Sequence, residues 1–181
     1  MHLVIFHFFI FAISGIPFIL MGRNKALSFS LTYGMLDMGD YFLERIKDGK
    51  YERDGTYLPL KLRKYEVVGK EAIFYETEEG HLIERNAENY DKEISDGVYV
   101  ALRIPDRSDE ITFRQSILPL AQSVADAQKL LAQSNLGSNY LLADIHGNIG
   151  YQQTGSVPLR PNSDGLLPLP AWDSANLWKG L

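Results

Sequence analysis

The segment YLLADIHGNIGYQQ, residues 140–153, predicts a β-hairpin and decides the fold class of the chain around it. Tyr140 to Ala143 and Ile149 to Gln153 have the composition of paired strands. Between them, Asp144 can accept hydrogen bonds from turn amides, and Gly147 or Asn148 can adopt the positive φ that such a turn requires. Together with the helical and strand patterns on either side, the hairpin predicts an α+β protein.

Helical spacing precedes this hairpin. Apolar residues recur near helical spacing in Ile111 to Leu120 and again in Val124 to Leu131. Ser123 is a residue type that caps helix N-termini, so we expect two short helices separated near Gln122. After the hairpin, the chain from Val157 onward is rich in Pro, Gly and Trp and predicts irregular structure.

The first hundred residues predict further strands separated by turns. Gly22-Arg23-Asn24 and Gly69-Lys70-Glu71 have turn composition. Asp37 to Arg45 could hold a helical turn, and the polar segment Lys47 to Tyr57 predicts a surface loop. The expected strands are Phe18 to Met21, Ala26 to Thr32, Leu60 to Val68, Ala72 to Thr77, His81 to Arg85 and Val98 to Ile104.

The N-terminal stretch MHLVIFHFFIFAISGIPFIL, residues 1–20, is strongly apolar. It has no basic n-region of the kind that signal peptides carry. A membrane helix requires an unbroken apolar run of roughly 20 residues, and Gly15 and Pro17 interrupt this one. Its Phe, Ile and Val content favours buried strands over Val4 to Leu20, with a signal or anchor segment as the alternative.

Composition narrows the function classes. The chain has 181 residues, no cysteine and a formal net charge of −5. Its charge gives no electrostatic reason to expect nucleic acid, and the lack of cysteine excludes disulfides and thiolate metal sites. No GxSxG, Walker or GxGxxG motif occurs, and no complete active site emerges from the residues alone. The histidines lack metal-ligand spacing and are expected to be structural; they are His2, His7, His81 and His146.

Two groups of segments carry a resemblance to a known family. The first is SGIPFILMGRNKALSFSLT, residues 14–32, followed by DMGDYFLE, residues 37–44. The second is ADIHGNIGYQQTGSVPLR, residues 143–160, followed by DGLLPLP, residues 164–170, and WKG, residues 178–180. In order and spacing both resemble the penicillin amidase family of N-terminal-nucleophile hydrolases. The resemblance covers nearly the whole chain but only the middle of the family's β chain.

The resemblance implies an αββα fold and hydrolysis of linear amides, which releases an acyl group from an amine such as a β-lactam nucleus or a homoserine lactone. In the family, a serine exposed by autocleavage is the nucleophile and its own α-amino group is the base. That serine precedes the turn at Gly15 and an oxyanion asparagine follows Gly180, so we expect both outside residues 1–181. We therefore expect a single incomplete domain over 1–181, inactive alone, that works with an α chain and further β-chain segments. The parent family is periplasmic or secreted.

Two site residues, at the end of residues 14–32 and directly after it, follow from the resemblance. Tyr33 matches the position whose backbone N–H helps to form the oxyanion hole, a role that the fold rather than the side chain determines. Its bulk, in place of the usual small residue, would intrude on the acyl pocket. Leu31 lies where the family has a pocket-lining residue, and Phe29-Ser30 replaces the usual Trp-Gly.

The resemblance also implies calcium. Asp37 and Asp40 match carboxylate ligands, while Gly39 and Gly165 match backbone-carbonyl ligands. Four donors fall short of the roughly 6–8 oxygens that calcium usually takes, so we expect weak binding by this chain alone. The alternative is that Asp37 and Asp40 cap a helical turn and face solvent.

Two other functions stay open at this stage. The chain could be a non-catalytic binding or assembly module derived from the family, or a small membrane-anchored domain that uses Met1 to Leu20. Several motif residues also have structural interpretations. Asn24 is expected to be a turn residue, and Trp172 and Trp178 are expected to be packing anchors.

Overall fold

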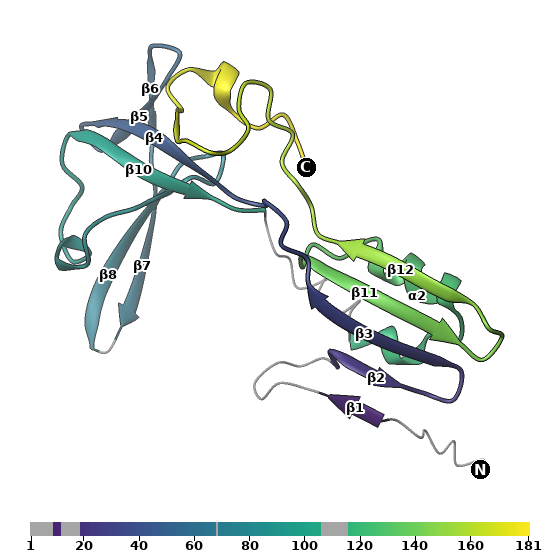
Figure 1. Ribbon diagram of the computed structural model, residues 1–181. Coiled ribbons are helices and arrows are strands. Elements are labelled where there is room, and N and C mark those ends of the chain that lie inside the picture. The colour runs from purple at the N-terminus through teal and green to yellow at the C-terminus, as the bar shows by residue number, and fades with distance from the viewer. Residues whose placement is uncertain (1–8, 12–18, 68, 106–115) are drawn as a thin grey trace. The chain divides into compact units, whose positions relative to one another are not determined.

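The computed structural model describes residues 9–11, 19–67, 69–105 and 116–181. The chain divides into two compact units. Unit 1 comprises Met1–Leu36 with Asp106–Ser156, and unit 2 comprises Asp37–Pro105 with Val157–Leu181. Strands dominate both, with one α-helix among the described residues, as the α+β prediction requires (Figure 1). None of the helices in the described ranges has the length and apolarity needed to cross a membrane.

Unit 1 is built on a five-stranded antiparallel sheet with the order β1-β2-β3-β11-β12. Its strands are β1 (Phe9–Phe11), β2 (Met21–Arg23), β3 (Leu27–Tyr33), β11 (Ser138–Asp144) and β12 (Ile149–Thr154). The hairpin predicted from residues 140–153 is confirmed as β11 and β12, with Gly147 at a φ of 85° in its turn. β11 also pairs with β3 over the full length of both strands.

The apolar face of this sheet lies against helical segments. Strand alternation places Leu27, Phe29, Tyr140 and Leu142 on one face, where they form a buried cluster with residues of the 3-10 helix η2 (Leu118–Leu120) and of helix α2 (Val124–Leu131). The predicted N-cap is confirmed, because the Ser123 side chain accepts a hydrogen bond from the Asp126 amide. Gly150 permits close packing, since a Cβ there would lie 2.4 Å from Val124 Cγ1.

Unit 2 contains an eight-stranded sheet. Seven of its strands follow the order β6-β5-β4-β10-β9-β8-β7, and the eighth, β13, pairs in parallel with β4. Its strands are β4 (Asp40–Lys47), β5 (Lys50–Arg53), β6 (Thr56–Pro59), β7 (Lys61–Val67), β8 (Lys70–Glu76), β9 (Leu82–Ile83), β10 (Gly97–Arg103) and β13 (Leu169–Pro170). Two 3-10 helices, η1 (Ala87–Asn89) and η3 (Ser174–Asn176), complete it. The predicted hairpin around Gly69 is confirmed as β7 and β8.

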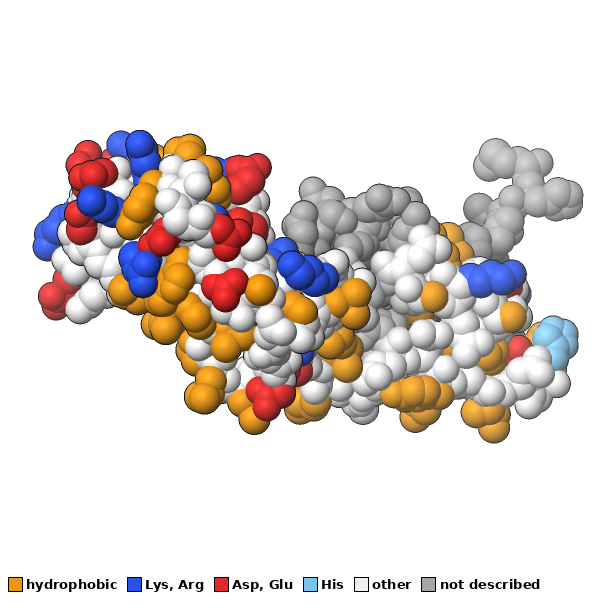
Figure 2. All heavy atoms as spheres, turned by 90° about the horizontal axis from the view of Figure 1, so that it is seen from above, with side chains coloured by type: hydrophobic (Ala, Val, Ile, Leu, Met, Phe, Trp, Pro, Cys, Tyr) orange, Lys and Arg blue, Asp and Glu red, His pale blue; other side chains and the backbone are white. Residues whose placement is uncertain are grey.

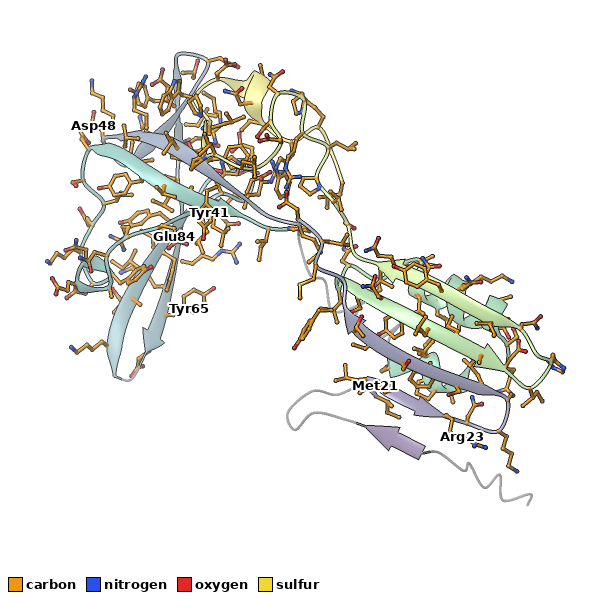
Figure 3. The ribbon with its side chains drawn as sticks, viewed as in Figure 1. Met21, Arg23, Tyr41, Asp48, Tyr65 and Glu84 are labelled. Atoms are coloured by element: carbon orange, nitrogen blue, oxygen red, sulfur yellow. The ribbon has the colours of Figure 1, made fainter. Side chains whose placement is uncertain are left out.

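Two predictions for this unit were wrong. Asp37 to Arg45 holds no helical turn, because Asp40–Lys47 is strand β4, whose residues alternate between buried and outward-facing. Lys47 to Tyr57 is not a loop but two tight turns flanking β5. Asp48-Gly49 and Asp54-Gly55 adopt positive φ at those turns, the pairing that two-residue hairpin turns favour. Asp48 marks the first of them in Figure 3.

The N-terminal prediction is confirmed in part. Of the buried strands predicted over Val4 to Leu20, Phe9–Phe11 is a strand paired with Met21–Arg23, while its burial and the structure of residues 4–8 and 12–18 lie outside what is described. The predicted turn at Gly22-Arg23-Asn24 was wrong at its first two positions, which belong to β2. The predicted helix over Ile111 to Leu120 is described only from residue 116, where η2 begins at Leu118.

Candidate functional site

The residues that the resemblance assigned to calcium meet in unit 2, at the start of β4. Arg160 lies between the two carboxylates. Its Nε donates to Asp40 Oδ2 at 2.6 Å, and its Nη2 lies 3.1 Å from Asp37 Oδ2. The hydrogen bond to Asp40 raises the pKa of the guanidinium. Asp40 is buried while Asp37 is largely exposed, so the solvent-facing alternative fails for Asp40.

Gly165 closes this cluster from the other side. Its φ is 81°, a conformation that favours glycine. A Cβ at this position would lie 2.9 Å from both Asp37 Oδ2 and Asp40 Oδ1, and 3.1 Å from Arg160 Cζ. Asp37, Asp40 and Gly165 are therefore neighbours, as the family resemblance led us to expect. Gly39 precedes Asp40 directly in the chain.

Trp178 holds the buried carboxylate in place. Its Nε1 donates to Asp40 Oδ2 at 2.6 Å, the same oxygen that Arg160 contacts. The indole packs with Phe42 and Ala171, and the Arg103 guanidinium lies 4.3 Å from its ring centroid. Trp178 is thus a packing anchor, as predicted, but its hydrogen bond to a residue 138 positions away was not foreseen.

These contacts leave one oxygen of Asp40 unused. Oδ1 is buried and has no hydrogen-bond partner among the described residues. A cavity of about 10 Å³ bordered by Asp40, Arg160 and Trp178 is close to the smallest that holds one water-sized species. The described ranges contain no group of three acidic, histidine or cysteine side chains suited to a metal. Among the described residues, Asp40 Oδ1 is thus a buried acceptor without a donor, and Arg160 already supplies positive charge to both carboxylates.

Tyr33 ends strand β3 in unit 1, and the residue is 79% exposed. Gly34 N donates to Gly137 O at 3.0 Å, and Ser138 N turns away from β3 toward Thr154 Oγ1. Antiparallel pairs alternate between bonded and non-bonded, so the Tyr33 N–H points to the edge of β3 opposite β11. On that edge, the described part of β2 pairs only with Ser28 and Phe29. The geometry therefore directs this N–H out of the β3–β11 ladder.

The open face of the unit 1 sheet carries a shallow hollow. Its volume is about 240 Å³, and its lining residues are Ser30, Leu31, Thr32, Asn139, Leu141 and Tyr151. Tyr151 OH donates to Asn139 Oδ1 at 2.6 Å, which fixes the polar end of the hollow. Leu31, the predicted pocket-lining residue, borders this hollow and also packs partly against the core below α2.

Asn24 has a larger role than the turn position predicted for it. Its Nδ2 donates to Pro119 O at 2.7 Å and to Ala121 O at 2.8 Å, while its Oδ1 accepts from the amides of Ala26 and Leu27. This buried side chain ties the start of β3 to η2. The sequence offered no signal for it, because the partners lie 95 and 97 residues away.

Comparisons with known proteins show the family of the chain. Residues 7–181 match the family model described as penicillin amidase. The chain belongs to the penicillin amidase family. Acyl-homoserine lactone acylase QuiP of Pseudomonas syringae pv. tomato is 33% identical over 93% of this chain and 21% of its own length. Penicillin G acylase of Escherichia coli is 26% identical over 91% of this chain and 20% of its own length.

A solved structure supports the same fold. The thermostable penicillin G acylase from Alcaligenes faecalis matches with a TM-score of 0.75 at 21% identity, covering 92% of this chain and 31% of the other. The resemblance inferred from the two groups of segments is therefore confirmed. This penicillin amidase chain spans about a fifth of the length of the sequence relatives it matches.

The ADIHGNIGY segment of this penicillin amidase chain has a structural role. Asp144 Oδ1 accepts from the amides of His146 and Asn148, and its Oδ2 accepts from Val124 N at 3.1 Å. The Asn148 side chain contributes most to a pKa of about 2 for this carboxyl. One carboxylate therefore closes the hairpin turn and caps the first turn of α2.

Proposed function

We propose that this chain forms a central part of an amidase that hydrolyses linear amide C–N bonds, releasing an acyl group from an amine such as a β-lactam nucleus or a homoserine lactone. The observation that carries the proposal is the penicillin amidase match over residues 7–181. The names of its relatives, acyl-homoserine lactone acylase and penicillin G acylase, refer to substrates with these two kinds of amine. The chain would form part of an αββα N-terminal-nucleophile fold.

In this proposal, Tyr33 contributes its backbone N–H to the oxyanion hole. The direction of that N–H, away from β11, supports the role because a donor committed to the sheet could not bind an oxyanion. The exposed Tyr33 side chain would border the acyl group, with Leu31 behind it. A serine nucleophile and its α-amino base would come from segments by which the relatives extend beyond this match, so residues 1–181 alone should not turn over substrate.

We further propose that Asp37, Gly39, Asp40 and Gly165 take part in binding calcium. The buried Asp40 Oδ1, which has no hydrogen-bond partner in the described part of the chain, supports this, and the Arg160 contacts to both carboxylates weaken it. When bound, the ion would supply positive charge that holds the start of β4 to residues 157–181. The binding should be weak in this chain alone, since calcium usually takes roughly 6–8 oxygens. Calorimetry that shows tight binding would contradict this proposal.

The activity is tested by reconstitution. The chain 1–181 is assayed for amine release from a phenylacetyl or fatty-acyl anilide, alone and joined to the flanking segments of a penicillin amidase relative. We expect no turnover alone and turnover after joining. Continued inactivity of a folded, joined protein would favour the binding or assembly module instead.

A matched pair of variants isolates the role of Tyr33. Tyr33→Pro removes the backbone N–H on an edge where the ladder does not use it, whereas Tyr33→Ala keeps the N–H and removes the ring. In the joined protein, the loss of one oxyanion donor should lower kcat by about 10²–10³ for Tyr33→Pro. Tyr33→Ala should change the acyl preference while retaining turnover. Equal rates for the two variants would exclude the oxyanion role.

A further inference from the structure

A second cluster of ionisable groups lies buried in unit 2, apart from Asp37 and Asp40. His81, beside the short strand β9, is fully buried, and its Nδ1 lies 2.6 Å from Glu44 Oε1. Glu44 is also fully buried and accepts two hydrogen bonds from Arg53, at 2.6 and 2.7 Å. Arg53 in turn contacts Glu79 at 3.0 Å. The β8–β9 turn is thereby joined to β4 and β5 through one imidazole and one guanidinium.

The surroundings of the ring define its protonation. Phe42 stacks on it with ring centroids 4.3 Å apart and an interplanar angle of 13°. His81 Nε2 is buried and has no hydrogen-bond partner among the described residues. The contact with the Glu44 carboxylate requires a proton on Nδ1. A second proton, on Nε2, would be buried without an acceptor, which is costly. The ring is therefore suited to the neutral form that carries its proton on Nδ1.

Charge balance leads to the same form. The charged groups that act on the ring are Glu44 from β4, Arg53 from β5 and Arg103 from β10, and Glu79 from the β8–β9 turn pairs with Arg53. Two carboxylates and two guanidiniums balance, so a protonated imidazole would leave one uncompensated positive charge. Burial lowers the pKa of His81, and this outweighs the hydrogen bond to Glu44, which raises it.

We propose that His81 is an acid-sensitive latch, which holds the β8–β9 turn on β4 while the imidazole is neutral and releases it when the imidazole is protonated. The latch is independent of the proposed amidase activity and uses none of its residues. It links the stability of unit 2 to mildly acidic pH.

The sign of this pH dependence follows from proton linkage. Since the folded-state pKa lies below the ordinary value near 6.5, the unfolded state binds more protons at low pH. The stabilisation is complete above pH ~6.5 and is lost as pH falls toward the folded-state pKa. One proton taken up on unfolding raises the unfolding constant about tenfold per pH unit in this window.

Two measurements on the full chain test the latch. Nitrogen-15 NMR of the imidazoles, with His81 assigned by its loss in His81→Asn, gives the protonated nitrogen and the titration midpoint. We expect protonation at Nδ1 and a midpoint below 6.5. Hydrogen exchange of the β9 and β10 amides, corrected for intrinsic rate, gives the opening constant of unit 2 between pH 8 and 5.

Two variants, His146→Asn and His81→Asn, test whether His81 causes the acid-dependent opening of unit 2. Wild type and His146→Asn, which alters an exposed imidazole in unit 1, should show the same acid-dependent opening of unit 2. His81→Asn keeps a donor near Glu44 but cannot be charged, so its opening should be flat below pH 6.5. A proton on Nε2, a midpoint at or above 6.5, or matching slopes for wild type and His81→Asn would each overturn the proposal. If His81→Asn does not fold, nuclear Overhauser effects between the stacked Phe42 and His81 rings assign the His81 signal, so the imidazole spectrum of wild type still decides the question.

Discussion

Units 1 and 2 bury polar groups in different ways. Among the described residues of unit 1, the buried polar ones are uncharged, and they are Asn24, Ser134, Ser138 and Thr154. Unit 2 buries Asp40, Glu44, Arg53 and His81, and the ion pairs found among the described residues all lie within it. The charged side chains visible in Figure 2 likewise gather over unit 2.

This difference determines which substitutions and conditions destabilise each unit. In unit 1, a buried side-chain amide or hydroxyl forms hydrogen bonds with backbone groups. Removing that side chain therefore leaves uncharged groups without a hydrogen-bond partner. In unit 2, buried charges satisfy one another, and removing one member leaves the others charged and desolvated. Unit 2 should therefore respond more strongly to single polar substitutions and to acid.

The largest expected effect tests the buried charges directly. Glu44→Ala removes the partner of both Arg53 and His81 and should lower the free energy of unfolding of unit 2 by about 3–5 kcal/mol. Glu71→Ala is the matched control, because it breaks an exposed pair with Lys64 that should contribute about 0–1 kcal/mol. Urea unfolding monitored separately for each unit measures both. Similar losses for the two variants would contradict the comparison.

Packing in unit 1 should give the next effect. Gly150→Ala places a Cβ 2.4 Å from Val124 Cγ1 and should cost about 1–3 kcal/mol through overpacking. Adding Val124→Ala makes room, so the double variant should lose less stability than the two single variants combined. Strict additivity would show that the clash is relieved elsewhere. The double-mutant cycle is measured by chemical unfolding.

Removing a neutral buried group in unit 1 should lower the free energy of unfolding by less than Glu44→Ala does in unit 2. Asn24→Ala leaves the Pro119 and Ala121 carbonyls and the Ala26 and Leu27 amides without their partner. We expect a loss of about 1–3 kcal/mol, with exchange protection lost first at β3 and η2. A loss as large as that of Glu44→Ala would remove the distinction between the units.

The smallest effect concerns acid below the range in which His81 acts. Asp144 has a pKa of about 2, below its ordinary 3.8, so its contribution to unit 1 is complete above pH ~4 and is lost as pH falls toward 2. Asp144→Asn should abolish this part of the acid response, as followed by circular dichroism of the folded fraction. An unchanged acid profile in the variant would assign the response to other carboxyls.

Local turns made parts of the fold predictable. The hairpins around Gly69 and Gly147 and the Ser123 cap depend on residues close in sequence. The Asp-Gly turns at 48–49 and 54–55 carried the same kind of signal, which the polar composition of the segment obscured. Strand β4 was harder to predict, because acidic residues in a strand are buried only when distant partners pair with them.

The candidate site was likewise predictable only in part from the sequence. Family resemblance brought Asp37, Asp40 and Gly165 together correctly. Asp40 is held by Arg160 and Trp178, which lie 120 and 138 residues further along the chain. Neither residue type indicates such a partner in the sequence. Side-chain contacts between distant segments follow from the completed fold.

Strand β4 is also constrained in how it can evolve. Asp40, Phe42, Glu44 and Ile46 alternate inward along it, while the residues between them face outward or are partly covered. Adding or removing one residue within 40–46 would turn part of this row to solvent and bury its neighbours instead. Homologues should therefore vary β4 by substitution while keeping its length, and tolerate insertions at the Asp-Gly turns beyond its end.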